Sequence, residues 1–182
     1  MTKNREVLIL LDADVVIHFF KAERLSLLFE LYPNRLYMLD VVLKELLDNR
    51  TMRDQVENLF TFKHVEEIKF TTSLPVNVFS EYIQLKKSGK GEGESATLIY
   101  CKHHAHIIAS SNTRDIKDFC ETHSVAYLTT LDILCIAVHN EKLTEKEADQ
   151  LIELILQKNS KLSDSNLFNY RKNRFNPDKL LF

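Results

Sequence analysis

The feature that most constrains the fold is an unbroken apolar run, Val7–Leu11, which ends in Asp12. A continuous apolar run of this length predicts a parallel strand that is buried on both faces. Ligands of open α/β sheets bind beyond the carboxyl ends of the strands, and Asp is rarely buried unless it is paired or binds a metal. The stretch by itself leaves two interpretations open. Asp12 belongs to a site, or Asp12 or Asp14 is only the N-cap of the next helix.

Composition sets the class of protein but does not name its partner. The chain has 182 residues, of which 45% are hydrophobic, so we expect a globular protein with a real core. It has no apolar run of membrane-spanning length and no signal-peptide pattern. Its three cysteines form no CxxC pair, so we expect reduced thiols in a cytoplasmic protein without membrane association. The net charge of −2 lacks the basic excess that many nucleic-acid binders show.

Apolar strand-like runs alternate with amphipathic segments along most of the chain. The alternation predicts an α/β protein, a three-layer α/β/α sandwich around a central, mainly parallel sheet of about five strands. The predicted strands are 7–12, 36–39, 65–70, 106–111 and 125–128. The predicted helices are 14–31 with a break near 21–23, a helix that Asp40 caps, 52–61, 76–85, 94–104, 112–123, 129–140 and one that starts at Thr144.

Carboxylates follow the ends of several of these strands. With right-handed crossovers, Asp12, Glu45, Glu94 and Asp115 are expected to converge at one edge of the sheet. All three glycines lie within 89–93, which indicates a loop that needs unusual backbone angles or a close approach. Several carboxylates stay ionised side by side only with a strong counter-charge, and oxygen ligands suit Mg²⁺ or Mn²⁺. Such a centre supports hydrolysis of a phosphodiester bond.

These motifs together resemble the PIN domain family. They are Leu11-Asp12-Ala13-Asp14, Glu45 within 42–46, Gly91-Glu92-Gly93-Glu94-Ser95, and the stretch 108–116. Their order and spacing are similar to the branch of VapC-like toxins and PilT N-terminus-type ribonucleases, over roughly residues 7–140. The resemblance implies a cytoplasmic Mg²⁺- or Mn²⁺-dependent endoribonuclease, with Asp12, Glu45, Glu94 and Asp115 as its catalytic and metal-binding residues. It also implies a PIN-like nuclease domain over residues 1–157, followed by a polar and basic extension over 158–182.

The chain departs from the family pattern at the fourth acid. Thr113 stands where many members have Asp, so either Asp115 reaches the metal or Asn112 serves as a neutral ligand. Asp14 is expected to support the site rather than to bind the metal first. Asp132 is a weaker metal candidate, and capping of a helix is favoured for it.

Other functions remain open from the sequence. A degenerate PIN domain could bind RNA or a protein without catalysis. A phosphatase of the haloacid-dehalogenase type is disfavoured, because Val15-Val16 replaces its Gly-Thr pair and no Gly-Asp dipeptide occurs.

The expected partners are an RNA substrate, the antitoxin of a toxin–antitoxin pair and a second copy of the chain. Two basic segments bear on these partners. Lys86, Lys87 and Lys90 could meet RNA phosphates, although a lysine run is usually a solvated face. The basic and aromatic tail 170–175 could grip RNA, dock on a partner or stay disordered.

Overall fold

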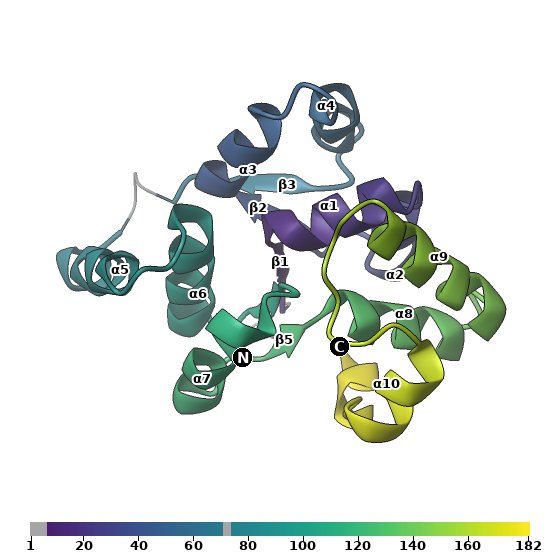
Figure 1. Ribbon diagram of the computed structural model, residues 1–182. Helices are drawn as coiled ribbons and strands as arrows, with labels where there is room; N and C mark the ends of the chain where they lie inside the picture. The colour runs from purple at the N-terminus through teal and green to yellow at the C-terminus, as the bar shows by residue number, and fades with distance from the viewer. Residues whose placement is uncertain (1–6, 71–73) are drawn as a thin grey trace, which may run out of the picture.

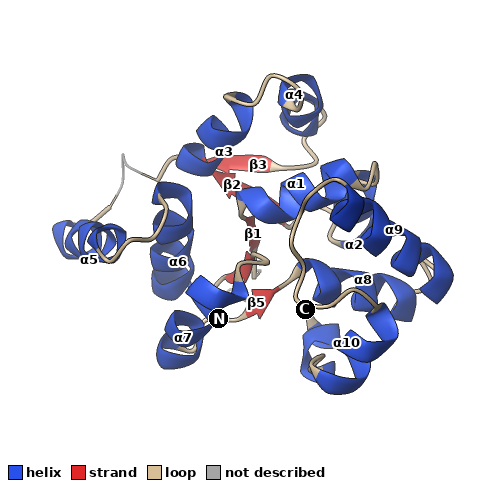
Figure 2. Ribbon diagram, in the orientation of Figure 1, coloured by secondary structure: helices blue, strands red, loops and turns tan. Residues whose placement is uncertain are grey.

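The centre of the molecule is a five-stranded parallel sheet. The computed structural model describes residues 7–70 and 74–182. Its strands are β1 (Ile9–Leu11), β2 (Leu36–Leu39), β3 (Glu66–Ile68), β4 (Ile107–Ala109) and β5 (Tyr127–Leu128). They lie in the order β3-β2-β1-β4-β5, and every pairing is parallel (Figures 1 and 2). The predicted fold class, a three-layer α/β/α sandwich, is confirmed.

Helices cover both faces of the sheet. In Figure 1, α5, α6 and α7 lie on one side of the strands, whereas α1, α2, α8 and α9 lie on the other. The bounds are α1 (Ala13–Lys21), α2 (Ser26–Leu31), α3 (Asp40–Leu47), α4 (Arg53–Thr61), α5 (Val76–Lys87), α6 (Glu92–His104), α7 (Thr113–His123), α8 (Thr130–His139), α9 (Glu145–Gln157) and α10 (Leu167–Asn173). A short 3-10 helix, Pro177–Leu181, follows α10.

Burial explains why these segments form these elements. All three residues of β1 are at most 1% exposed, as expected for a strand with neighbours on both edges and helices on both faces. At the sheet edge, β3 is different, because Glu66 and Glu67 are exposed and only Ile68 is partly buried. Helices α8 and α9 each begin with a capping box, formed by Thr129 with Asp132 and by Thr144 with Glu147.

The element boundaries differ from prediction mainly by a few residues. The strands other than β2 are shorter than predicted, because residues at the ends of each predicted run belong to the adjoining loops. Helix α6 begins at Glu92, so the glycine-rich loop is shorter than predicted. Asp40 is not the N-cap of α3 but its first residue. Its carboxylate nevertheless accepts hydrogen bonds from the backbone N–H groups of Val41 and Phe70, both at 3.0 Å.

The C-terminal extension folds onto the sandwich. Leu167 and Tyr170 of α10 are buried, and α10 contacts α8 and α9. Disorder, one of the options left open for residues 170–175, is therefore not what the structure describes. Among the described residues, no helix has both the length and the apolar character needed to traverse a lipid bilayer.

Candidate metal centre

The acidic residues gather where the chain reverses its direction of travel across the sheet. From β1 the chain moves to β2 on one side, and β4 leads to β5 on the other, so β1 and β4 flank the topological switch point. This is the place where ligands of open α/β sheets bind. The first turns of α1, α6 and α7 contain Asp14, Glu94 and Asp115, respectively. The positive ends of three helix dipoles therefore stabilise negative charge at this edge.

Asp12 lies at the centre of this edge. It is the N-cap of α1, and its Oδ1 accepts a hydrogen bond from the Ala13 N–H at 2.9 Å. Its own backbone N–H donates to Ala109 O at 2.9 Å, which fixes it against β4. The residue is only 7% exposed. Burial is the main cause of a raised Asp12 pKa, and the nearby negative charge of Glu45 raises this pKa further.

Asp14 is held by the turn that follows β4. Its Oδ2 accepts hydrogen bonds from the Ser111 N–H at 2.8 Å and from the Ser110 hydroxyl at 3.3 Å. Its Oδ1 is buried and has no hydrogen-bond partner within the described part of the chain. Burial, with a further contribution from the charge of Asp12, raises the pKa of Asp14 to about 7. Asp14 is therefore a partly buried acid with one buried oxygen that no described residue contacts by a hydrogen bond.

Glu45 reaches the site from α3 by contacting the start of α6. The Gly93 N–H donates to Glu45 Oε1 at 3.1 Å. A Cβ atom at position 93 would lie 3.0 Å from this same Oε1 and 3.0 Å from Val42 Cγ2, so only glycine fits without a shift. Gly89 has a φ of 98°, which also favours glycine. Both properties expected of the glycine-rich loop, close approach and an unusual backbone angle, are present.

Glu94, Asn112 and Asp115 form a connected group beside Asp12. The Asn112 amide Nδ2 donates to Asp115 Oδ2 at 2.6 Å and to Glu94 Oε2 at 3.4 Å. Burial raises the pKa of Glu94; Lys90 counteracts this, and the charges of Asp12 and Asp115 add to it. Lys90 Nζ lies 3.5 Å from Glu94 Oε1 and also donates to the Asp115 carbonyl oxygen. The neighbouring Glu92 instead points to α5, where it pairs with Lys86 at 3.0 Å.

The donor chemistry of this edge fits a hard divalent cation, but the arrangement is looser than a closed metal shell. Its ligands would all be oxygens, which suits Mg²⁺ or Mn²⁺. Two buried oxygens, Asp14 Oδ1 and Glu94 Oε1, accept no hydrogen bond from any residue that the structure describes. Over residues 7–70 and 74–182, however, no three Asp, Glu, His or Cys side chains are positioned to hold a metal ion. In this arrangement Lys90 supplies positive charge beside Glu94.

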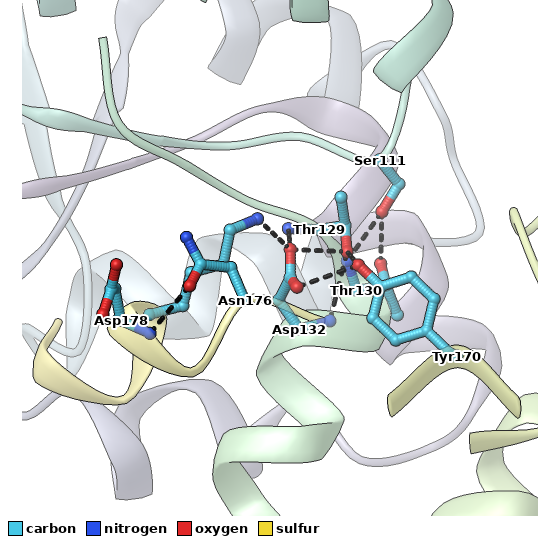
Figure 3. A network of polar contacts seen from close by, with 8 residues as sticks. Ser111, Thr129, Thr130, Asp132, Tyr170, Asn176 and Asp178 are labelled. Atoms are coloured by element: carbon cyan, nitrogen blue, oxygen red, sulfur yellow. Dashed lines mark hydrogen bonds and ion pairs between the residues drawn. The ribbon is translucent and has the colours of Figure 1, made fainter. Parts of the chain in front are cut away.

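Asp132 belongs to a different environment, drawn in Figure 3. It is 0% exposed, and its Oδ2 accepts from the Thr129 N–H at 2.8 Å and the Thr129 hydroxyl at 2.9 Å. Lys179 Nζ lies 2.7 Å from the same oxygen, while the Tyr170 hydroxyl donates to Oδ1 at 2.8 Å. Both oxygens are thus engaged in capping α8 and holding the C-terminal segment. This is the capping role favoured from the sequence, and we leave Asp132 out of the candidate centre.

A chain of neutral groups connects the Asp14 turn to the helices behind it. The Ser111 hydroxyl lies 2.7 Å from Thr130 Oγ1 and accepts from the Thr130 N–H at 2.8 Å (Figure 3). Thr130 Oγ1 in turn lies 2.8 Å from His18 Nδ1. Burial is the main cause that lowers the pKa of His18 to about 4. The imidazole is therefore neutral at physiological pH, and the chain links α1, α8 and the β4 turn.

The structure places most of the predicted acids close enough to interact with one another. Asp12 interacts electrostatically with Asp14, Glu45 and Glu94, and Asp115 joins through Asn112. Sequence reasoning did not find the role of Ser110 and Ser111 in holding Asp14. Two consecutive serines directly after a buried strand were the available signal, because small hydroxyl side chains at a strand end can bind a neighbouring carboxylate.

Comparison with models of known protein families and with curated proteins found no match for this chain. The resemblance to the PIN domain family therefore rests on the motif residues alone.

Proposed function

We propose that the chain is a metal-dependent endoribonuclease that uses Mg²⁺ or Mn²⁺ to hydrolyse RNA phosphodiester bonds. The observation that carries the proposal is the raised pKa of Asp12, a carboxylate 7% exposed at the switch point of the sheet, beside Glu45 and Glu94. Nearby carboxylates that are partly desolvated attract a divalent cation more strongly than water-exposed ones. The role of toxin in a toxin–antitoxin pair, with an antitoxin and a second copy of the chain as partners, belongs to the same proposal and is motivated by the motif resemblance.

The residues divide into holding and orienting roles. Asp12 and Glu94 would be the primary ligands of the cation, and Glu45 would support them directly or through water. The bound cation supplies Lewis-acid stabilisation of the negative charge that develops on the phosphodiester. Asp115 is exposed, and Asn112 holds one of its carboxylate oxygens. The other carboxylate oxygen of Asp115, Oδ1, accepts no hydrogen bond within the described residues. This oxygen is free to orient the attacking water.

The proposal is tested by cleavage of single-stranded RNA by the purified chain in Mn²⁺. Asp12→Asn should reduce the rate by more than about 100-fold, since loss of even an outer ligand costs up to that factor. Asp54→Asn, an exposed Asp in the first turn of α4, is the matched control and should cleave like the parent chain. EDTA should abolish cleavage by both. Equal rates for Asp12→Asn and the parent would sink the proposal.

A specific observation favours a second candidate, a non-catalytic domain that binds RNA or a protein. Lys90 and Glu94 are both largely buried, with side chains 19% and 12% exposed, and the lysine supplies positive charge where a cation is proposed. Thr113 also leaves the usual fourth acid absent. A crystal soaked in Mn²⁺ separates the candidates. Density for an ion against Asp12 and Glu94 supports the nuclease, and its absence supports the non-catalytic domain.

A further inference from the structure

A cavity next to the acidic residues is lined in part by Thr113. A cavity of about 400 Å³ lies between the start of α7, the end of β5 and the C-terminal segment. Thr113 lines it, and the preceding residue, Asn112, contacts both Glu94 and Asp115. The cavity therefore adjoins the candidate metal centre. The larger cavity of about 640 Å³ is at the opposite edge, where Val7 and Ile107 precede or begin strands.

The outer wall of this cavity is firmly anchored. Tyr170 and Lys179 line the cavity, and both are tied to the buried Asp132, as Figure 3 shows for Tyr170. The Lys179 ammonium also lies 4.1 Å from the centroid of the Tyr127 ring. Because Asp132 neutralises it, Lys179 is a structural cation. The wall is pre-formed by buried contacts, so a ligand would not have to order it.

Two other cations in the lining are available to a ligand. Arg174 is exposed and makes no ion pair with any described residue. Among the described residues Lys117 pairs only with Glu121, at 3.7 Å, and the two side chains are 56% and 62% exposed. An exposed pair of this kind contributes little and is readily exchanged for a ligand. The two cations therefore line the cavity without strong competition from the described residues.

The neutral lining adds donors and contributes no negative charge. Within the described part of the chain, the side chains of Thr113, Ser163 and Asn173 make no hydrogen bond, and none of the cavity-lining residues is Asp or Glu. Hydroxyl, amide, guanidinium and ammonium groups all donate hydrogen bonds. A pocket that offers donors and positive charge selects an anion with several acceptor oxygens, and phosphate is the anion that Arg and Lys recognise most commonly in nucleic acids.

We propose that this cavity binds a backbone phosphate of a single RNA strand, next to the phosphodiester that lies at the acidic residues. Cleavage of that neighbouring phosphodiester rests on the proposed function, but binding of the strand does not. The acidic edge repels a polyanion, and the chain as a whole has a net charge of −2. Cations beside the acids are therefore needed to bring RNA to them. Residues 158–182 supply one wall of this subsite.

The test measures binding of a fluorescently labelled single-stranded 12-nucleotide RNA by the full chain in EDTA, where no cleavage occurs. The pocket variant is Lys117→Gln with Arg174→Gln. The control is Lys63→Gln with Lys142→Gln, which removes the same charge from exposed sites that line neither the cavity nor the acidic edge. The pocket variant should bind roughly tenfold more weakly, and its salt slope should be smaller by about 0.7 for each lost phosphate contact.

Three outcomes overturn the proposal. Unchanged RNA affinity in the pocket variant leaves a protein as the better occupant, and an equal loss in the control reduces the effect to overall charge. Saturation of the pocket by inorganic phosphate at micromolar concentration, without competition by RNA, makes it a site for a small free anion. The two proposals can fail separately. If RNA binding depends on the pocket but no cleavage occurs, only the nuclease proposal is wrong. If RNA is cleaved and the pocket variant binds and cleaves it like the parent chain, only the inference about this cavity is wrong.

Discussion

Two aspartates near the same sheet edge, one buried and one partly buried, have opposite surroundings. Asp132 is 0% exposed, and a lysine, a tyrosine and a threonine engage both of its oxygens. Asp14 has one oxygen held by Ser110 and Ser111, whereas the other has no partner among the described residues and lies near the charge of Asp12. An acid whose oxygens are all paired is compatible with folding, whereas an acid with one unpaired buried oxygen opposes it and persists where it serves another purpose.

The comparison also separates the two kinds of counter-charge. Lys179 reaches Asp132 at 2.7 Å and is itself only 13% exposed, so the pair behaves as a permanent structural contact. Lys90 Nζ lies 3.5 Å from Glu94 Oε1, and this buried oxygen accepts no hydrogen bond within the described residues. Lys179 thus neutralises Asp132 permanently, whereas Lys90 leaves Glu94 available to a cation that binds more strongly.

Removing the charge of Asp132 should have the largest effect on stability. Asp132→Asn leaves the Lys179 ammonium buried without its pair, and we expect a loss of about 4 kcal/mol in the free energy of unfolding. Urea denaturation measures it. Asp178→Asn, in the same C-terminal segment but exposed, should change the free energy by less than about 0.5 kcal/mol. Similar stabilities for the two variants would remove the distinction drawn between the aspartates.

Asp14 should make stability depend on pH in the opposite sense from a paired acid. Burial, the main cause, raises its pKa from 3.8 to about 7 in the folded chain. Between these values the native state keeps a proton that the unfolded state has released, so the free energy of unfolding falls as the pH rises from about 4 to 7.

The Asp14→Asn variant isolates this effect. It should lose much of the downward slope and be more stable than the parent at pH 8, by an amount on the order of 2 kcal/mol. Denaturation at a series of pH values provides the measurement, and Asp54→Asn should keep the slope of the parent. A parent chain whose stability rises from pH 4 to pH 7 would contradict the assignment.

The smallest expected effect concerns Lys90. In Lys90→Gln the competing ammonium is gone, so Mn²⁺ should bind roughly tenfold more tightly, a change of about 1.4 kcal/mol. Isothermal titration calorimetry measures it. Lys86→Gln is the matched control, because Lys86 pairs with the outward-facing Glu92, and it should bind Mn²⁺ like the parent. Failure of all three chains to bind Mn²⁺ would favour the non-catalytic candidate.

Two observations were enough to predict the architecture and the convergence of the acids. They are the hydrophobic periodicity and the position of the carboxylates at the ends of the predicted strands. The second strand, Leu36–Leu39, agrees with prediction at both ends, since polar and turn residues bound it. Asp12 and Glu94 were predictable because the carboxyl ends of parallel strands and the helices that follow or precede them share one edge. Gly93 was informative for the same reason, because it lies where Glu45 must approach the backbone.

What the sequence could not supply was the pairing between distant segments. Lys179 and Tyr170 meet Asp132 across 47 and 38 residues, and no local pattern encodes such contacts. The part played by Asn112 was also out of reach. Sequence allowed it to be a neutral metal ligand, whereas in the structure its amide nitrogen faces two carboxylates and donates to both. Side-chain direction at the fourth acid position depends on the turn into α7, which spacing alone does not fix.

The hydroxyl chain from Ser111 through Thr130 to His18 has a consequence for how the site responds to its surroundings. Its single titratable member, His18, has a pKa lowered to about 4, so the chain keeps one hydrogen-bonding pattern across the physiological pH range. Asp14, held by the same turn, changes charge near pH 7. The hydrogen bonds that hold this turn therefore stay the same as the pH changes, whereas the charge of Asp14 does not. Acidification would change how strongly this edge attracts a cation without moving the groups that hold it.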